Sequence, residues 1–243
     1  MPVATSDLAH HVSTSAGSSG GVIAGTYTSG VKNNIWPDVS DAERIAGGDR
    51  YRKTFWKNNH GTDALLAPVV FFNVAPVNCT LLLGWGISDA SDDDPAQGNM
   101  TAFAAPAVVS VESDGADTRQ VTIVGLDNSG TPVPMTENVV LNGTTPVLSS
   151  TTWSKVHAVY VASTSASRIV TVKQGSGGPS RGVIGLNKKL CWLWQSAGTT
   201  KASGLQLPDL PAGQNIGVWR KKSWTAGAGA IRPNTLSITI EEN

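Results

Sequence analysis

Apolar and polar residues along this chain alternate in short runs, and they do not recur every three to four positions. Apolar side chains at every second position indicate half-buried β-strands, and helical periodicity is almost absent. Turn-forming residues, such as Asp114-Gly115 between two of the runs, separate them at spacings of about 8 to 15 residues. The pattern predicts strands at 51–59, 67–76, 78–88, 107–113, 118–127, 136–141, 155–163, 166–175, 189–197, 215–223 and 234–242.

These strands predict an all-β fold, an antiparallel β-sandwich of jelly-roll-like character. With 243 residues, the chain is long enough for one large sandwich or two small ones. Residues 1–33 are rich in Ser, Thr and Gly, hold little that fills a core, and predict an extended N-terminal arm lying on a neighbouring subunit. We expect a first β region over 34–105 and a second over 106–243, with a single sandwich formed by both as the alternative.

The clearest helical signal lies between the arm and the first strand, in "WPDVSDAERIAGG". Ser40 fits a helix N-cap, and Glu43 three residues later completes a capping box. Gly47 and Gly48 then supply a left-handed stop, so we predict a single helical turn that ends at Ala46. Such a turn would swing the chain from the arm into the first strand.

The strand after this turn carries cationic and aromatic residues on both faces. Its alternation places Arg50, Arg52 and Trp56 on one face. Arg and aromatic side chains dominate the energy of protein–protein contacts. A second cationic run, 220–222, would suit an acidic patch on a partner, although a solvated strand end is the plainer interpretation. The candidate interface residues are Trp36, Arg50, Arg52, Trp56, Arg220, Lys221 and Lys222.

The chain offers few residues for catalysis. Its four histidines have no neighbours at metal-ligand spacing, and motifs such as the P-loop or the nucleophile elbow are absent from the sequence. We therefore predict no enzymatic activity, no catalytic residue and no cofactor. Carboxylates close together can bind calcium, although adjacent aspartates do not converge easily, so a solvated loop is the preferred interpretation. The calcium candidates are Asp89, Asp92, Asp93 and Asp94.

Charge and hydropathy limit the classes of partner that this chain is expected to have. Eighteen basic and 18 acidic residues cancel, so no overall field favours nucleic acid or an anionic membrane surface. Charged residues make up 15% of the chain, against roughly 25% in typical soluble domains, which favours a protein assembled with other chains, such as a homo-oligomer. No apolar run is long enough for a transmembrane helix, and "MPVATSDLAHHVS" lacks the features of a signal peptide.

Tryptophan and cysteine complete the candidates. Eight tryptophans suggest a platform that binds carbohydrate, for example a glycan of a host. Trp192 and Trp194 alternate and would face the same side of a strand, where core or interface is the commoner role. Cys79 and Cys191 lie in apolar, strand-like runs and are predicted to be buried free thiols.

Three segments resemble virion structural proteins of tailed bacteriophages. They are "NNIWPDVSDAERIAGGDRYRKTFWKNNHG" with the following "APVVFFNVAP" and "TLLLGWG", then "GLDNSGTPVPMTENVVLNGTTPVLSSTTWSKVHAVYV", and the closing "LPAGQNIGVWRKKSWTAGAGAIRPNTLSITIEE". Together they cover about half of the chain, and none of them is a catalytic signature.

The resemblance implies a non-enzymatic, β-rich building block of the virion, made in the cytoplasm of the host bacterium. Its partners would be other virion structural proteins and further copies of itself, contacted through the N-terminal arm and the β-edges. A place in the tail, baseplate or neck is the leading expectation. A capsid decoration protein is the alternative within this class, and a receptor- or glycan-binding module is the alternative from another class.

Overall fold

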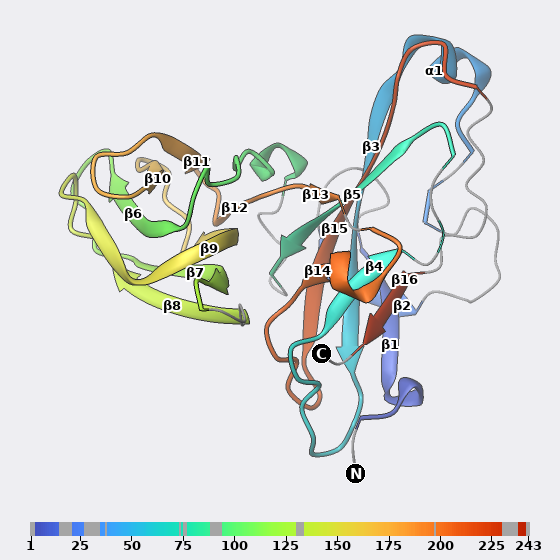
Figure 1. Cartoon of the computed structure of the whole chain (residues 1–243), viewed down its shortest axis with the longest axis horizontal. Helices are drawn as coiled ribbons and strands as arrows, with labels where there is room; N and C mark the ends of the chain where they lie inside the picture. Colours follow the sequence, from blue (N-terminus) through green and yellow to red (C-terminus); the bar gives the residue numbers. More distant parts are fainter. Residues whose placement is uncertain are drawn as a thin grey trace. The chain divides into compact units, whose positions relative to one another are not determined.

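The computed structural model describes residues 3–14, 21–26, 35–36, 38–72, 74, 77–87, 94–129, 134–196, 198–229 and 238–241. This part of the chain is nearly all β, with antiparallel sheets packed as sandwiches, which confirms the predicted fold class. The chain divides into two compact units (Figure 1). Unit 1 comprises Met1–Ser91 and Gln195–Asn243, and unit 2 is Asp92–Trp194.

Unit 1 is built on a six-stranded antiparallel sheet in the order β13-β5-β15-β3-β1-β2 (Figure 1). Its strands are β1 (Leu8–Ser13), β2 (Ile23–Thr26), β3 (Gly48–Asn58), β5 (Thr80–Gly86), β13 (Gln195–Ser196) and β15 (Asn215–Trp224). The central strand β15 pairs with β3 on one side and with β5 on the other. On the far side of β3, β1 adds as a further strand, and β2 pairs with β1.

A three-stranded sheet, β14-β4-β16, completes unit 1. Its strands are β4 (Val69–Phe72), β14 (Leu205–Gln206) and β16 (Ile238–Glu241). All four side chains of β4 are buried, as expected for a continuous apolar run. The helical elements of the described chain are α1 (Asp41–Ala46) and the 3-10 turns Thr5–Asp7, Pro95–Gln97 and Lys201–Ser203.

Unit 2 contains seven strands around an apolar core. They are β6 (Ala107–Ser113), β7 (Gln120–Asp127), β8 (Pro134–Val140), β9 (Val147–Val161), β10 (Val170–Gln174), β11 (Ser180–Ile184) and β12 (Leu190–Trp192). The long strand β9 joins two groups: its first half pairs with β6 and so with β10 and β11, and its second half pairs with β7 and so with β8. Trp153 lies at this junction, is fully buried, and donates its indole N–H to Ser149 Oγ at 3.2 Å.

Polar side chains form hydrogen bonds that attach the two outer strands of unit 2 to neighbouring segments. The amide of Asn99 both donates to the backbone oxygen of Val183 in β11 and accepts from its nitrogen, at 2.8 and 3.0 Å. At the other end, the carboxylate of Glu137 in β8 accepts from the backbone nitrogens of Ser150 and Thr151 in β9, at 2.6 and 3.0 Å. Asn99 thereby occupies backbone groups that the edge strand β11 would leave open, and Glu137 attaches the edge strand β8 to β9.

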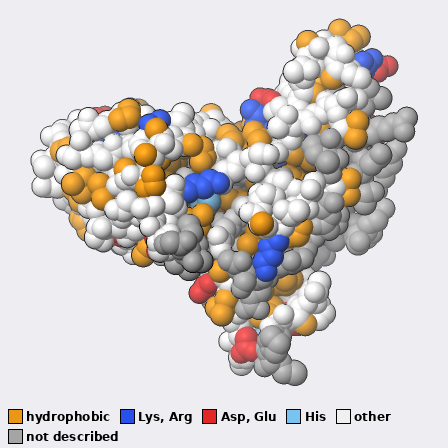
Figure 2. Space-filling model, in the orientation of Figure 1, with side chains coloured by type: hydrophobic (Ala, Val, Ile, Leu, Met, Phe, Trp, Pro, Cys, Tyr) orange, Lys and Arg blue, Asp and Glu red, His pale blue; other side chains and the backbone are white. Residues whose placement is uncertain are grey.

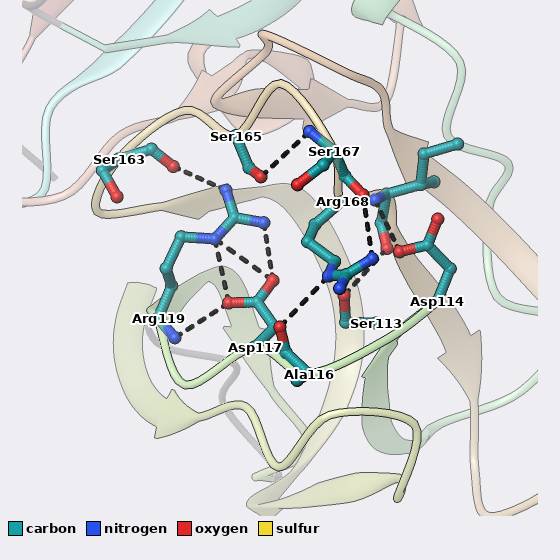
Figure 3. Close-up of polar contacts among 10 residues, drawn as sticks. Ser113, Asp114, Ala116, Asp117, Arg119, Ser163, Ser165, Ser167 and Arg168 are labelled. Atoms are coloured by element: carbon teal, nitrogen blue, oxygen red, sulfur yellow. Dashed lines mark hydrogen bonds and ion pairs between the residues drawn. The ribbon is translucent and has the colours of Figure 1, made fainter.

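A polar network, in place of a hairpin turn, holds the connection between β6 and β7 (Figure 3). The buried Asp117 receives both the guanidinium and the backbone N–H of Arg119. Arg119 donates onward to the loop before β10, and Arg168 of that loop donates back to the connection. The turn predicted from Asp114-Gly115 is therefore not a hairpin, because β6 and β7 each pair with β9 instead of with one another.

Each predicted strand overlaps an observed one, and four observed strands, β1, β2, β11 and β14, were not predicted. The segment of β11, "SRGVI", has no clear apolar alternation because Gly182 interrupts it. That glycine leaves room for Met100, whose Cγ would be 2.5 Å from an added Cβ. Tertiary packing, rather than strand propensity, therefore selects β11.

The division of the chain also differs from the predicted ranges. Strands β13 to β16 belong to the sheets of unit 1, so the range 106–243 does not form one region. Within the predicted arm, 1–33, β1 and β2 are strands of the large sheet: β1 pairs with β3, and β2 pairs with β1. Alternation places Leu8, His10 and Val12 on one face of that sheet. Residues 1–2, 15–20 and 27–33 of that arm lie outside the described residues.

Candidate functional site

The strand register gathers most of the predicted interface residues on one face of the large sheet of unit 1, which we call the cationic face. Its residues are Arg50, Arg52, Trp56, Arg220 and Lys222. Arg52 of β3 lies opposite Arg220 of β15, and Arg50 lies opposite Lys222. Because strand side chains alternate, these residues point to the same side, as the sequence predicted for those of β3.

The cationic face is covered within the single chain. Arg220 and Lys222 are 0% and 1% exposed, and Trp36 and Trp56 are also buried. The ammonium of Lys222 lies 6.0 Å from the ring centroid of Trp36, and burial lowers the pKa of Lys222. These four residues therefore make contacts inside unit 1, which corrects the expectation that they face a partner.

Lys221 points to the opposite face of the same strand. It is half-buried, and its ammonium pairs with the carboxylate of Asp49 at 2.9 Å. Tyr51 donates its hydroxyl to that same carboxylate at 3.0 Å. The run 220–222 thus splits between the two faces of the sheet, and its lysines have different surroundings.

Beside the end of this sheet, α1 forms a compact structure with the turn 225–229, which we call the tip. Ser40 Oγ accepts from the backbone N–H of Glu43, and the Glu43 carboxylate accepts from the backbone N–H of Ser40 at 2.8 Å. This capping box and the end of α1 at Ala46 confirm the prediction. Gly47 has a φ of 74°, and a Cβ there would lie 2.7 Å from the backbone nitrogen of Ala226.

Glu43 is the centre of the tip. Its carboxylate accepts two hydrogen bonds from Arg50, at 2.7 and 2.9 Å. Those bonds, followed by the bond from the Ser40 backbone, lower the pKa of Glu43 to about 2. Its backbone carbonyl accepts from the indole N–H of Trp224 at 3.0 Å, and Arg44 next to it donates to the carbonyl of Ala228 at 2.7 Å. The tip is therefore fixed to both β3 and β15.

One large apolar side chain of the tip faces solvent. Ile45 is 63% exposed, the highest value among the exposed large apolar residues of the described chain. Its own carbonyl accepts from Gly227, so the backbone beneath the side chain is held. The tip thus presents an apolar anchor on a fixed support.

At the other side of β3, the N-terminal strand inserts a histidine into the cationic face. The ring of His10 in β1 stacks on Trp56, with centroids 4.6 Å apart and planes at 21°. Arg220 donates a hydrogen bond to Nε2 of His10. Burial, followed by the charge of Arg220, lowers the pKa of His10 to about 2. Sequence reasoning gave His10 no role, although its place between Leu8 and Val12 was the available signal.

The opposite face of the sheet contains a buried lysine that the interface prediction did not include. Lys53 is fully buried, and its ammonium lies 5.2 Å from the ring centroid of Phe55. Its Cε would lie 2.6 Å from a Cβ at Gly217 and 3.2 Å from one at Gly86. The two glycines, on strands that flank one another, leave the space that the lysine stem occupies.

The acidic loop provides little for a metal site in the described residues. Asp94 accepts from the backbone N–H of Ala96 at 2.9 Å and pairs with the ammonium of Lys188 at 3.0 Å. Asp89, Asp92 and Asp93 lie outside the described residues. In the part of the chain that the structure describes, no group of three His, Cys, Asp or Glu residues is placed to hold a metal ion.

The tryptophans are mostly core residues. Trp194 is partly buried and packs edge-to-face against the fully buried Trp192, with centroids 5.5 Å apart. The other buried tryptophans are Trp36, Trp56, Trp85, Trp153, Trp219 and Trp224. None of the eight is exposed, so the core interpretation preferred for Trp192 fits all but Trp194.

Comparisons with known proteins identify no relative: no protein-family model matches this chain, and no curated protein or solved structure is similar to it. Among the described residues, no helix has the length and apolar character needed to cross a membrane. The candidate site therefore rests on its own geometry. Its parts are a buried cationic face, a fixed tip with an exposed isoleucine, and an N-terminal strand docked through a histidine.

Proposed function

We propose that this chain is a non-enzymatic structural component of a tailed-phage virion, in the tail, baseplate or neck. The sequence resemblance to such proteins supports this role, and two of the three resembling segments build α1, β3 and β15. These elements form the tip and the centre of the large sheet. In this proposal the chain acts by docking to its neighbours through the tip, the N-terminal strands and the β-edges.

The observation that carries the proposal is the tip. An apolar side chain on a rigid support loses little conformational entropy on binding, so the burial of Ile45 by a partner would be favourable. The bonds of Glu43 and Arg44 to β3, β15 and the turn after β15 supply that rigidity. A residue that only filled the core of its own chain would not be 63% exposed.

The surface chemistry is in keeping with assembly. Figure 2 shows a face on which charged side chains are few and lie in small groups among neutral and hydrophobic ones. Interface cores are depleted of charged residues, whereas free soluble surfaces usually carry many. A sparsely charged chain is thus suited to being covered by neighbours.

Incorporation into particles tests the proposal. Ile45→Asp should reduce the amount of the protein in purified particles at least about tenfold, because a charge would have to be buried at the contact. Leu148→Asp is the matched control: Leu148 is 44% exposed but lies on β9 of unit 2. Both variants should fold normally, which circular dichroism and thermal melting check.

The number and place of copies in the particle separate the alternatives. Quantitative mass spectrometry should find copies in threes, sixes or twelves for a tail, baseplate or neck protein, and hundreds on the head for a decoration protein. Absence from particles would refute the proposal. Equal incorporation of the two aspartate variants would remove the tip as the docking element.

A further inference from the structure

The N-terminal strands of unit 1 form a hairpin that is attached along a single edge. Among the described strands, β2 pairs with β1 alone, and β1 pairs with β2 and with β3. The contact with β3 runs from Leu8 opposite Asn58 to Val12 opposite Thr54. The hairpin is therefore a peripheral element that can leave as a unit, without breaking the pairing of β3 with β15.

The docked hairpin depends on the protonation state of one side chain. Arg220 donates to Nε2 of His10, and a guanidinium has only donors, so Nε2 must be the unprotonated nitrogen. The same ring is stacked on Trp56. The site on β3 thus recognises a strand with a neutral imidazole between apolar neighbours.

Protonation of His10 would turn its favourable contact with Arg220 into an unfavourable one. An imidazolium has no acceptor for Arg220, and it would be a cation next to a buried cation. The charges of Arg220 from β15 and of His11 in its own strand act on His10, and Arg52 of β3 lies opposite Arg220 on the same face of the sheet. The low pKa of His10 agrees with this arrangement.

We propose that the edge of β3, with the side chains of Trp56 and Arg220 that contact His10, is an exchangeable docking site that accepts the N-terminal hairpin of a second copy of this chain, and that protonation of His10 opens it. This inference extends the proposed assembly role by naming the partner and the switch. A second copy is the fitting occupant because every copy carries the same hairpin. Exchange between copies keeps all of the contacts, so it costs little beyond association.

The direction of the pH effect follows from the lowered pKa. An undocked His10 takes up a proton near pH 6.5, whereas the docked one resists it. The contribution of neutral His10 to docking is therefore fully present above that pH and decreases below it. The ratio of undocked to docked hairpin rises up to tenfold for each pH unit below 6.5. At pH 4.5 the expected increase is up to about 100-fold.

Mixed single-cysteine variants of the full chain test the exchange. Ala9 lies opposite Lys57 in the β1–β3 register, so Ala9→Cys in one chain and Lys57→Cys in another can form a disulfide only across two copies. Both variants carry Cys79→Ser, because Cys79 is free and half-buried, whereas the free Cys191 is buried. The mixture is held at pH 7.5 or 4.5, returned to pH 7.5 and oxidised. The mixed dimer should be at least ten times more abundant after pH 4.5.

Two histidine variants identify the switch. His10→Gln stays neutral and can still accept from Arg220, so it should abolish the increase at pH 4.5. His11→Gln, the matched control on the adjacent position, should retain it. If His10→Gln does not fold, the pH response of the parent pair still decides. Equal dimer yields at both pH values would overturn the proposal. An equal yield of mixed dimer with Ser150→Cys of unit 2 in place of Lys57→Cys would also overturn the proposal.

This experiment is independent of the virion role. Exchange in the purified chain with absence from particles would retain the docking site and reject the proposed function. Presence in particles without exchange would retain the proposed function and reject the docking site.

Discussion

The two units of this chain treat their strand edges and their buried charges in different ways. Unit 2 bonds its outer strands to neighbouring segments through Asn99 and Glu137, and the buried carboxylate of Asp117 pairs with Arg119. Unit 1 ends its large sheet in the short strands β2 and β13, and it buries Lys53, Arg220 and Lys222. Among the described residues, unit 1 thus buries cations, whereas unit 2 buries a carboxylate beside a guanidinium.

In this chain the buried cations and the short outer strands β2 and β13 occur in the same unit, and a physical reason connects them. In unit 2 the pairing of Asp117 with Arg119 offsets part of the cost of removing the carboxylate from water. In the proposed exchange of the N-terminal hairpin, the buried Arg220 helps to specify the strand that unit 1 accepts, because it donates to Nε2 of His10. The following substitutions test this contrast, from the largest expected effect to the smallest.

Removal of the central tryptophan of unit 2 should give the largest loss of stability. Trp153→Ala leaves a cavity where β9 passes between its two groups of partners and removes the bond to Ser149, so the free energy of unfolding should fall by about 4 kcal/mol. Calorimetry should show one transition shifted and the other unchanged. An equal shift of all transitions would mean that the two units do not unfold independently.

Breaking the polar connection of unit 2 should come next. Asp117→Ala leaves the Arg119 guanidinium without its carboxylate and should cost about 3 kcal/mol, measured by denaturant unfolding. The Arg119 hydrogen bond holds the pKa of Asp117 below its usual value. The contribution is therefore complete above about pH 4 and disappears as the pH falls, so the variant and the parent should converge in acid. A constant difference down to pH 2 would contradict this.

Loss of the helix cap should have a moderate and local effect. Ser40→Ala removes the hydroxyl that accepts from the backbone N–H of Glu43, while the backbone N–H of residue 40 can still donate to the Glu43 carboxylate. The change should destabilise α1 by about 1 kcal/mol, measured by hydrogen exchange of residues 41–46. Ser40→Asp is the matched control, because aspartate caps as well as serine. Faster exchange in both variants would show that the hydroxyl itself, and not the cap, holds the tip.

The smallest effect separates the two lysines of one strand. Lys222→Met replaces a buried cation with an apolar side chain and should stabilise unit 1 by up to about 1 kcal/mol. Burial lowers the pKa of Lys222, so its unfavourable charging is complete at neutral pH and vanishes as the pH rises through about 10.4. The gain should vanish there as well. Lys221→Met, which loses the pair with Asp49 and the contact of the ammonium with the Tyr51 ring, should give no gain at any pH.

Alternation and turn residues predicted most of the fold, because strands with one buried face must alternate. The capping box of Ser40 and Glu43 was predictable for a similar reason, since its signal is local. The burial of Arg220 and Lys222 was not predictable, because it depends on the pairing of β15 with β3, which lies far away in the sequence. The pairing of β1 with β3 gives His10 its role, and the alternation of Leu8, His10 and Val12 indicates a strand but not the strand that it pairs with.

The position of β15 has a consequence for synthesis on the ribosome. This strand lies between β5 and β3, yet residues 87–214 separate it from β5 in the chain. While the protein is being made, β3 and β5 must wait for their shared partner, whereas all strands of unit 2 are complete once Trp192 has emerged. The inserted unit can therefore fold first, and residues 195–243, which leave the ribosome after it, complete the sheet whose edges were exposed longest.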